Sequence, residues 1–287
     1  MFYLLVPVSS QVPQRLGLIA GRGAYPLVFA ECARKAGVDE LFVIAFKGET
    51  DRAIEKHASV VRWIRVGELE SLLVNLKEAG IVQAVMAGQL APKHLFRVRL
   101  DAQMKELLAR LKTRNAETIF GAVADELKAI GIELLPASRF MESAMPVAGQ
   151  LSRRGPTDRE HADMELGLHV AKVTSGLDIG QTVVVKEGTI LAVEAFEGTD
   201  EAIKRAAKLA GAGLVVVKTA KAGHDMRFDI PVIGVHTLQL LGKLRAAALF
   251  VDAGQTILLE REKVIRLADD CDICVVAVDA SGIQGAS

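Results

Sequence analysis

Short runs of consecutive apolar residues recur along the first half of the chain, and segments with apolar residues at every third or fourth position separate them. The clearest runs are residues 16–20, 41–46 and 82–87, with a further candidate at 63–66 and another at 132–136. Such runs, bounded by glycine or charged residues, predict buried strands, and the intervening spacing predicts helices. Alternation of strand and helix predicts an α/β domain with a parallel sheet, which we place at 16–136.

The second half of the chain follows a less regular pattern. Residues 179–185 and 189–193 flank Lys186-Glu187-Gly188 and predict a β-hairpin. Further strands are predicted at 214–217, 248–251 and 275–278, with helices at 158–174, 201–209 and 237–247. We therefore expect a second α/β domain at 161–287, joined to the first by a linker or active-site loop at 137–160. Residues 1–15 lack the basic start and the longer apolar core of a signal peptide, and we interpret them as a leader of uncertain order.

Composition and charge narrow the possible functions. The 287 residues suffice for two domains, and 35 Lys and Arg balance 35 Asp and Glu. With zero formal charge and only 5% aromatic residues, the chain is not expected to bind nucleic acid. Three cysteines and the lack of an apolar run of about 20 residues favour a soluble cytoplasmic protein. Cys271 and Cys274 are interpreted as small apolar residues at a strand start rather than as a redox or zinc pair.

Two glycine turns follow predicted strands of the first domain. Gly21-Arg22-Gly23 comes directly after residues 16–20, and Gly88 comes directly after residues 82–87. Glycine turns at the carboxyl ends of parallel strands are typical of nucleotide-binding folds, where the backbone approaches a phosphate. The fingerprint is incomplete, so a plain tight turn remains the alternative.

A dense polar stretch, Lys218 to Pro231, follows the predicted strand at 214–217. Its carboxylates, Asp225 and Asp229, suit a hard cation. Its cations, Lys218, Lys221 and Arg227, suit phosphate oxygens. The alternative is a solvated charged turn.

A second polar cluster follows the predicted strand at 189–193 and includes Glu194, Glu197, Thr199 and Asp200. Thr199 or Asp200 is predicted to cap the next helix, whose first N–H groups suit a phosphate. The alternative is a capping sequence with surface acids. If the two strands are neighbours, both clusters surround one crevice and suit Mg²⁺-assisted attack on a phosphoanhydride, or a carboxylate that orients water.

At these positions the sequence closely resembles the LpxI-type UDP-2,3-diacylglucosamine pyrophosphatases of lipid A biosynthesis. The matching segments are LIAGRG at 18–23 with Pro26, GQTVVV at 180–185, VEAFEGTD at 193–200 with Arg205, and KAGHDMRFDIP at 221–231 with Gly234. The resemblance implies a Rossmann-like N-terminal domain, a C-terminal domain of family-specific fold, and a substrate site between them. It also implies divalent-metal-dependent hydrolysis of UDP-2,3-diacylglucosamine to UMP and 2,3-diacylglucosamine 1-phosphate (lipid X). In the family the aspartate that matches Asp225 is essential, whereas His224 stands where a glutamine is expected.

The residues and the resemblance together lead to specific assignments. The expected catalytic residues are Asp225, Lys221 and Arg227. The expected ligands of Mg²⁺, or of another divalent cation such as Mn²⁺, are Asp225, Asp200, Glu197 and Asp229. The expected substrate contacts are Gly21, Gly23, Gly88, Thr199 and Lys218.

The expected partners are the lipid-nucleotide substrate, the cytoplasmic leaflet of the inner membrane as a transient peripheral contact, and a second copy in a homodimer. Two alternatives remain: another nucleotide-sugar enzyme, and a non-catalytic module that binds nucleotide or lipid.

Overall fold

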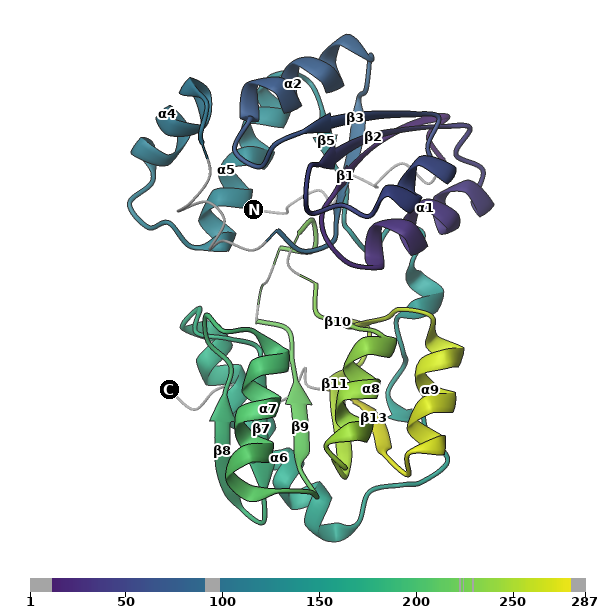
Figure 1. Cartoon of the computed structure of the whole chain (residues 1–287), viewed down its shortest axis with the longest axis vertical. Helices are drawn as coiled ribbons and strands as arrows, with labels where there is room; N and C mark the ends of the chain where they lie inside the picture. Colours follow the sequence, from purple (N-terminus) through teal and green to yellow (C-terminus); the bar gives the residue numbers. More distant parts are fainter. Residues whose placement is uncertain (1–11, 91–98, 222, 224, 229, 280–287) are drawn as a thin grey trace, which may run out of the picture. The chain divides into compact units, whose positions relative to one another are not determined.

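The computed structural model describes residues 12–90, 99–221, 223, 225–228 and 230–279. The chain forms two compact units, Met1–Phe140 and Met141–Ser287 (Figure 1). Each unit has its own β-sheet with helices, which confirms the predicted α/β class.

The first unit contains a five-stranded parallel sheet in the order β3-β2-β1-β4-β5. Its strands are β1 (Arg15–Ala20), β2 (Glu40–Phe46), β3 (Val60–Ile64), β4 (Gln83–Ala87) and β5 (Glu133–Leu134). Its helices are α1 (Tyr25–Lys35), α2 (Leu69–Glu78), α4 (Ala102–Arg110) and α5 (Ala116–Ala129), with a 3₁₀ turn η1 (Arg52–Lys56). This strand order is that of a doubly wound Rossmann-like sheet, whose direction of winding reverses between β1 and β4.

The second unit contains a six-stranded mixed sheet in the order β6-β13-β11-β9-β7-β8. Its strands are β6 (Gly149–Gln150), β7 (Thr182–Lys186), β8 (Thr189–Val193), β9 (Val215–Lys218), β11 (Ala248–Asp252) and β13 (Cys274–Val278). Strands β9, β11 and β13 are parallel, whereas β7 runs antiparallel to both β9 and β8. A separate parallel pair is formed by β10 (Val232–Ile233) and β12 (Ile257–Leu258).

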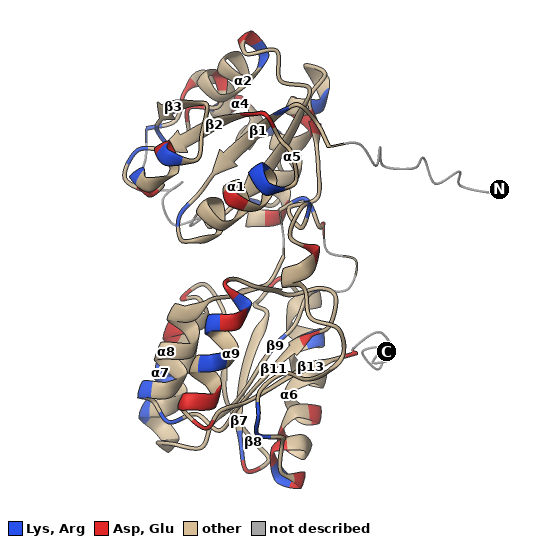
Figure 2. Ribbon diagram, turned by 90° about the vertical axis from the view of Figure 1, so that its right-hand side faces the viewer, with Lys and Arg blue, Asp and Glu red and all other residues tan. Residues whose placement is uncertain are grey.

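Helices cover both faces of this second sheet (Figure 2). They are α6 (Asp158–Gly176), α7 (Thr199–Ala210), α8 (Val235–Lys243) and α9 (Arg261–Asp270), with a 3₁₀ turn η2 (Glu142–Ala144). On one face, Met164 and Leu168 of α6 pack against Val217 and Phe250. On the other face, α7, α8 and α9 enclose a larger apolar core around alternate residues of the same strands.

One edge of the second sheet collects the segments that carry the predicted polar clusters. The carboxyl ends of β8, β9 and β11 lie there together with the start of β7, because Lys218 pairs with both Thr182 and Val251. Strands β8 and β9 are not adjacent, since β7 lies between them. The two clusters therefore lie at the same edge but are separated by one strand.

Local differences from the predicted elements have physical reasons. Strand β3 ends two residues earlier than the predicted 63–66 strand, and its exposed and half-buried residues give no continuous apolar run. The segment 137–160 contributes β6, which pairs with β13, and the first residues of α6. Cys274 is buried in β13 and Cys271 is exposed at the end of α9; burial raises the pKa of the Cys274 thiol to about 11. In the part of the chain that the structure describes, no helix is both long and apolar enough to cross a bilayer.

Candidate functional site

A series of hydrogen-bonded polar side chains joins β7, β8, β9 and α7 at the edge of the second sheet where both polar clusters lie. Lys218, only 9% exposed, donates a hydrogen bond of 2.7 Å from Nζ to Oγ1 of Thr199. Thr199 in turn donates from Oγ1 to Oε1 of Glu194 at 3.0 Å. Oγ1 of Thr182 lies 3.3 Å from Oγ1 of Thr199. The predicted helix cap was wrong: α7 begins at Thr199 itself, after Gly198, so the Thr199 hydroxyl is directed to neighbouring side chains. The structure thus brings together Thr199 and Lys218, two predicted substrate contacts.

Two acids of the second cluster, Glu197 and Asp200, are each paired with a basic residue. Glu197 lies 2.6 Å from Nη2 of Arg205, and the hydrogen bond from Arg205 is the main cause that lowers the pKa of Glu197. Asp200 lies 3.0 Å from Nε2 of His236. These two predicted metal ligands therefore contact cationic or ionisable partners in this structure.

The loop after β9 carries the predicted catalytic group. Arg227 binds Asp225 through a fork, with Nε at 2.9 and 3.0 Å from the two carboxylate oxygens and Nη2 at 2.6 Å from Oδ2. Lys221 Nζ lies 2.6 Å from Oδ1 of Asp178. Asp229 and His224 lie outside the described residues. The structure thus joins Asp225 and Arg227 directly, whereas Lys221 contacts an acid that the sequence did not single out.

The described residues do not assemble the predicted metal site. Over the described ranges, no group of three or more His, Cys, Asp or Glu residues lies close enough together to hold a metal ion. Asp225, Glu197 and Asp200 each have the basic neighbours described above. The predicted ligand set of Asp225, Asp200, Glu197 and Asp229 consequently stays a prediction.

The two glycine turns of the first unit meet each other at the point where the winding reverses. Arg22 N donates to Gln89 O at 2.8 Å, and Gln89 N donates to Arg22 O at 3.0 Å. A Cβ atom on Gly21 would lie 2.7 Å from Gln89 O, and one on Gly88 would lie 2.8 Å from Arg22 O. Close packing between the turns accounts for glycine at 21 and 88, whereas Gly23 has open space and a φ of +93°. The tight-turn alternative thus explains all three positions, Gly21 and Gly88 by close packing and Gly23 by its positive φ. Ligand contact by these glycines stays a prediction.

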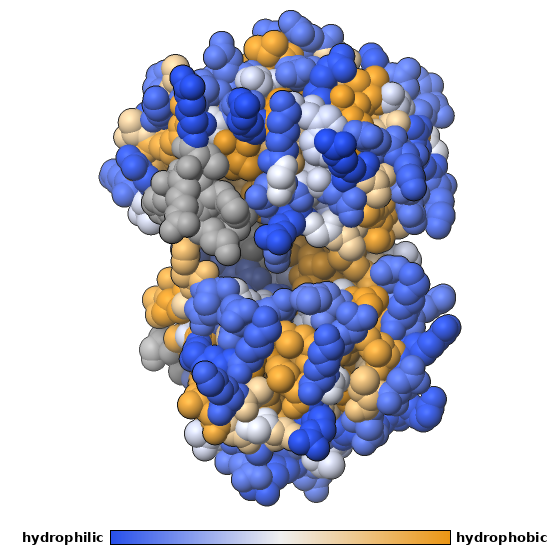
Figure 3. Space-filling model, in the orientation of Figure 1, coloured by the Kyte–Doolittle hydropathy of each residue, from blue (hydrophilic) through white to orange (hydrophobic). Residues whose placement is uncertain are grey.

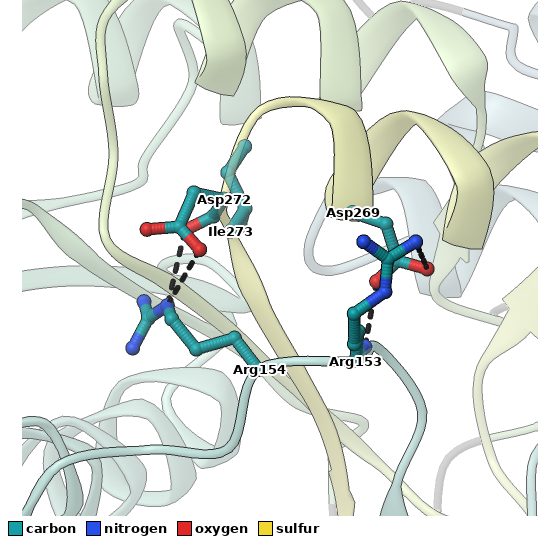
Figure 4. A pocket seen from close by; sticks show the side chains of 5 residues that line it. All are labelled: Arg153, Arg154, Asp269, Asp272 and Ile273. Carbon is teal, nitrogen blue, oxygen red and sulfur yellow. Dashed lines mark hydrogen bonds and ion pairs between the residues drawn. The ribbon is translucent and has the colours of Figure 1, made fainter.

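A basic pair at the opposite end of the second sheet, Arg153 and Arg154, lines a shallow pocket of about 220 Å³ together with acids (Figure 4). Arg154 donates two hydrogen bonds to Glu160, at 2.8 and 3.0 Å, and approaches Asp272 at 3.7 Å. Asp269 accepts from the backbone of Arg153 at 2.6 Å. These contacts explain Arg154 as a tie between α6 and the segment before β13, whereas the Arg153 side chain is 84% exposed and lies 4.0 Å from Asp269.

Sequence reasoning missed Asp252 and Lys172. Asp252 ends β11 as Lys218 ends β9, and its carboxylate lies 2.7 Å from Lys172 Nζ on α6. A charged residue directly after a buried apolar run was the available signal.

The fold and the site define a two-domain α/β protein with a cluster of paired cations and carboxylates at one end of its second sheet. The chain belongs to the LpxI family: residues 15–144 match the LpxI N-terminal domain and residues 147–276 match the LpxI C-terminal domain. It is 30% identical over 277 residues to a protein of Caulobacter vibrioides named UDP-2,3-diacylglucosamine pyrophosphatase LpxI, covering 93% of this chain and 98% of that protein.

Two solved structures show weak similarity to the chain. One is the biotin carboxylase domain of a Hydrogenobacter thermophilus 2-oxoglutarate carboxylase, with 13% identity, 69% of this chain and 42% of that chain covered, and a TM-score of 0.29. The other is an N5-carboxyaminoimidazole ribonucleotide synthetase, with 14% identity, coverage of 68% and 45%, and a TM-score of 0.28. Likeness at this level carries no inference about function.

Proposed function

We propose that the protein hydrolyses the pyrophosphate bond of UDP-2,3-diacylglucosamine, releasing UMP and 2,3-diacylglucosamine 1-phosphate. The observation that carries the proposal is the similarity to a named UDP-2,3-diacylglucosamine pyrophosphatase along 93% of the chain, through both units. The location of the substrate site between the two domains stays a prediction.

The polar edge of the second unit supports phosphoryl chemistry. A pyrophosphate brings negative charge, and Lys218, Lys221 and Arg227 supply cations at or just beyond the end of β9. Arg227 presents the planar fork that matches phosphate as well as the carboxylate that it binds here. In the proposed reaction Asp225 directs the attacking water, and Arg227 and Lys221 balance charge on the phosphate oxygens. A divalent cation, Mg²⁺ or Mn²⁺, belongs to the proposal because carboxylate and phosphate oxygens are ligands that such ions take.

Apolar side chains near the same edge support a lipid substrate. Leu177 and Phe196 are 67% and 69% exposed, and Ile179 is 45% exposed. They flank the β7 start and the β8 end, where Glu194 N donates to Thr182 O at 2.8 Å. Apolar side chains also appear between charged ones on the face of α7 and α8 (Figure 3). Such side chains would shield the acyl chains of the substrate from water. The proposal also includes a transient contact with the cytoplasmic leaflet of the inner membrane. It further includes a homodimer.

Release of UMP from UDP-2,3-diacylglucosamine tests the function. We expect turnover with Mg²⁺, none with EDTA, and a loss of about 10²–10⁴-fold in Asp225→Asn, which keeps the volume but removes the carboxylate charge. Glu201→Gln is the matched control, because Glu201 is an exposed carboxylate of the same unit that pairs with Lys204. Wild-type turnover in EDTA would remove the metal from the proposal, and undiminished turnover by Asp225→Asn would move the chemistry to another group. A folded wild type that binds UDP without releasing UMP would favour the binding-module alternative.

A further inference from the structure

A buried ion pair holds both backbone polar groups of one residue, Ala220, directly before the proposed catalytic loop. Oδ2 of Asp252 accepts a hydrogen bond from Ala220 N at 2.9 Å, and Lys172 Nζ donates to Ala220 O at 3.1 Å. Lys172 Nζ and Asp252 Oδ2 are themselves 2.7 Å apart. We call these three residues the Ala220 clamp.

The fold builds the clamp through close packing of α6 on the sheet. A Cβ atom on Gly167 would lie 2.7 Å from Cγ2 of Val217, so the helix approaches β9 as closely as glycine permits. Five residues further along α6, Lys172 contacts Asp252, the last residue of β11. Its side chain is 10% exposed and that of Asp252 is fully buried.

Overall stability does not account for such a pair. Burying two charges costs desolvation free energy, and apolar residues of similar volume often replace a buried pair without loss of stability. The second carboxylate oxygen of Asp252, Oδ1, is also buried and accepts no hydrogen bond from any described residue. The ion pair instead fixes the position of the chain just after β9, because it holds both the N–H and the C=O of Ala220.

Three consecutive residues are tied at this exit. Thr219 N donates to Gln181 O at 2.9 Å, Ala220 is held by the clamp, and Lys221 contacts Asp178 at 2.6 Å. Asp225 follows only four residues after Lys221. We propose that Lys172 and Asp252 are positioning residues for the hydrolysis: they orient the start of the loop that carries Lys221, Asp225 and Arg227. This inference rests on the proposed function.

The test removes the Lys172–Asp252 ion pair in two ways and compares the effect with that of breaking a second ion pair of the same unit. The variants are Asp252→Asn, which keeps an acceptor for Ala220 N, and the double variant Lys172→Met/Asp252→Leu, which leaves no buried charge unpaired. The control is Arg154→Met, which breaks the partly buried pair with Glu160 at the opposite end of the same sheet. We expect kcat to fall about 10- to 100-fold in the double variant with KM changed less than about threefold, and to fall less in Asp252→Asn. The control keeps the wild-type kcat.

Hydrogen exchange supplies a readout that does not require turnover. Amides of residues 219–221 are expected to exchange faster in the double variant than in the wild type, and to be unchanged in Arg154→Met. A double variant with wild-type kcat and wild-type exchange at these amides would overturn the proposal. If the wild type releases no UMP, the proposed function fails, and hydrogen exchange still decides whether the clamp holds the loop.

Discussion

Thr199 lies between a lysine and a glutamate at the first residue of α7, and its hydroxyl makes a hydrogen bond with each. It accepts from Lys218 and donates to Glu194, so one oxygen joins β9 to the end of β8. Oε2 of Glu194 is buried and receives no hydrogen bond from any described residue, which makes the bond to Oε1 the more important for this carboxylate. The bridge therefore depends on a hydroxyl, and the shape of the side chain alone would not replace it.

Replacing Thr199 by valine keeps the branched shape and removes that hydroxyl. We expect the free energy of unfolding to fall by about 1–3 kcal/mol, because a nearly buried ammonium and a carboxylate each lose a hydrogen bond. Thr199→Ser should recover most of the loss, since serine supplies the same oxygen. Urea unfolding of the three proteins at neutral pH measures the difference. A valine variant as stable as the wild type would show that water replaces the hydroxyl at no cost.

At the scale of elements, the first turn of α6 is held by a capping box and by an arginine from the preceding segment. Thr157 and Glu160 form a capping box, and Arg154 donates two hydrogen bonds to Glu160. Burial alone would raise the pKa of Glu160. The hydrogen bonds from Arg154 and Thr157, together with the charge of Arg154, outweigh it and hold the pKa below its ordinary value of 4.5.

This lowered pKa predicts an acid-dependent loss of stability. A carboxylate whose pKa is lower in the folded than in the unfolded state stabilises the fold above pH 4.5, and this contribution disappears as pH falls through the folded-state pKa. Glu160→Gln should therefore be less stable than the wild type at pH 7, and the difference should shrink between pH 5 and pH 3. Urea unfolding across this range measures it, with Glu165→Gln as a control on an exposed carboxylate of the same helix. A difference independent of pH would contradict the role given to the charge.

The elements that could be predicted from sequence are those whose local pattern decides them. Strand β9 is buried along its whole length and shows as a continuous apolar run. The β7–β8 hairpin has positive φ at Glu187 and Gly188, as its short turn requires. Strand β6 consists of only two residues, both exposed, and it is a strand only because it pairs with β13. No local sequence pattern therefore indicates it.

The candidate site shows the same division. Polar residues after apolar runs identified Lys218 and Asp225, because the apolar run at 214–217 leads into Lys218, the last residue of β9, and then into the loop that carries Asp225. Their partners Thr199 and Arg227 were also within the clusters. Asp252 and Lys172 were missed, because their meeting depends on how closely α6 packs against β9, which no spacing along the sequence reveals.

At the scale of the whole molecule, the boundary between the two units lies at residues 140–141, and the residues on either side of it are each held by contacts within their own unit. Tyr25 Oη donates to Ala137 O at 2.5 Å, and the ring of Phe140 lies 6.1 Å from that of Phe29, so the first unit needs residues up to Phe140. On the other side, Gly254 N donates to Pro146 O at 2.8 Å, and β6 pairs with β13. Each unit is of ordinary domain size.

These contacts predict how separate fragments of the second unit behave. A fragment of residues 141–287 retains β6, the Arg154 contacts and the capping box of α6, and we expect it to unfold in one cooperative transition. A fragment of residues 161–287, which begins at the boundary predicted from sequence, lacks all three. Loss of a cap costs about 1 kcal/mol and loss of a charged hydrogen bond about 1.5–3 kcal/mol, so it should be less stable by roughly 3 kcal/mol or more. Urea unfolding of both fragments measures this difference, and equal stability would show that residues 141–160 are a linker that the second sheet does not require.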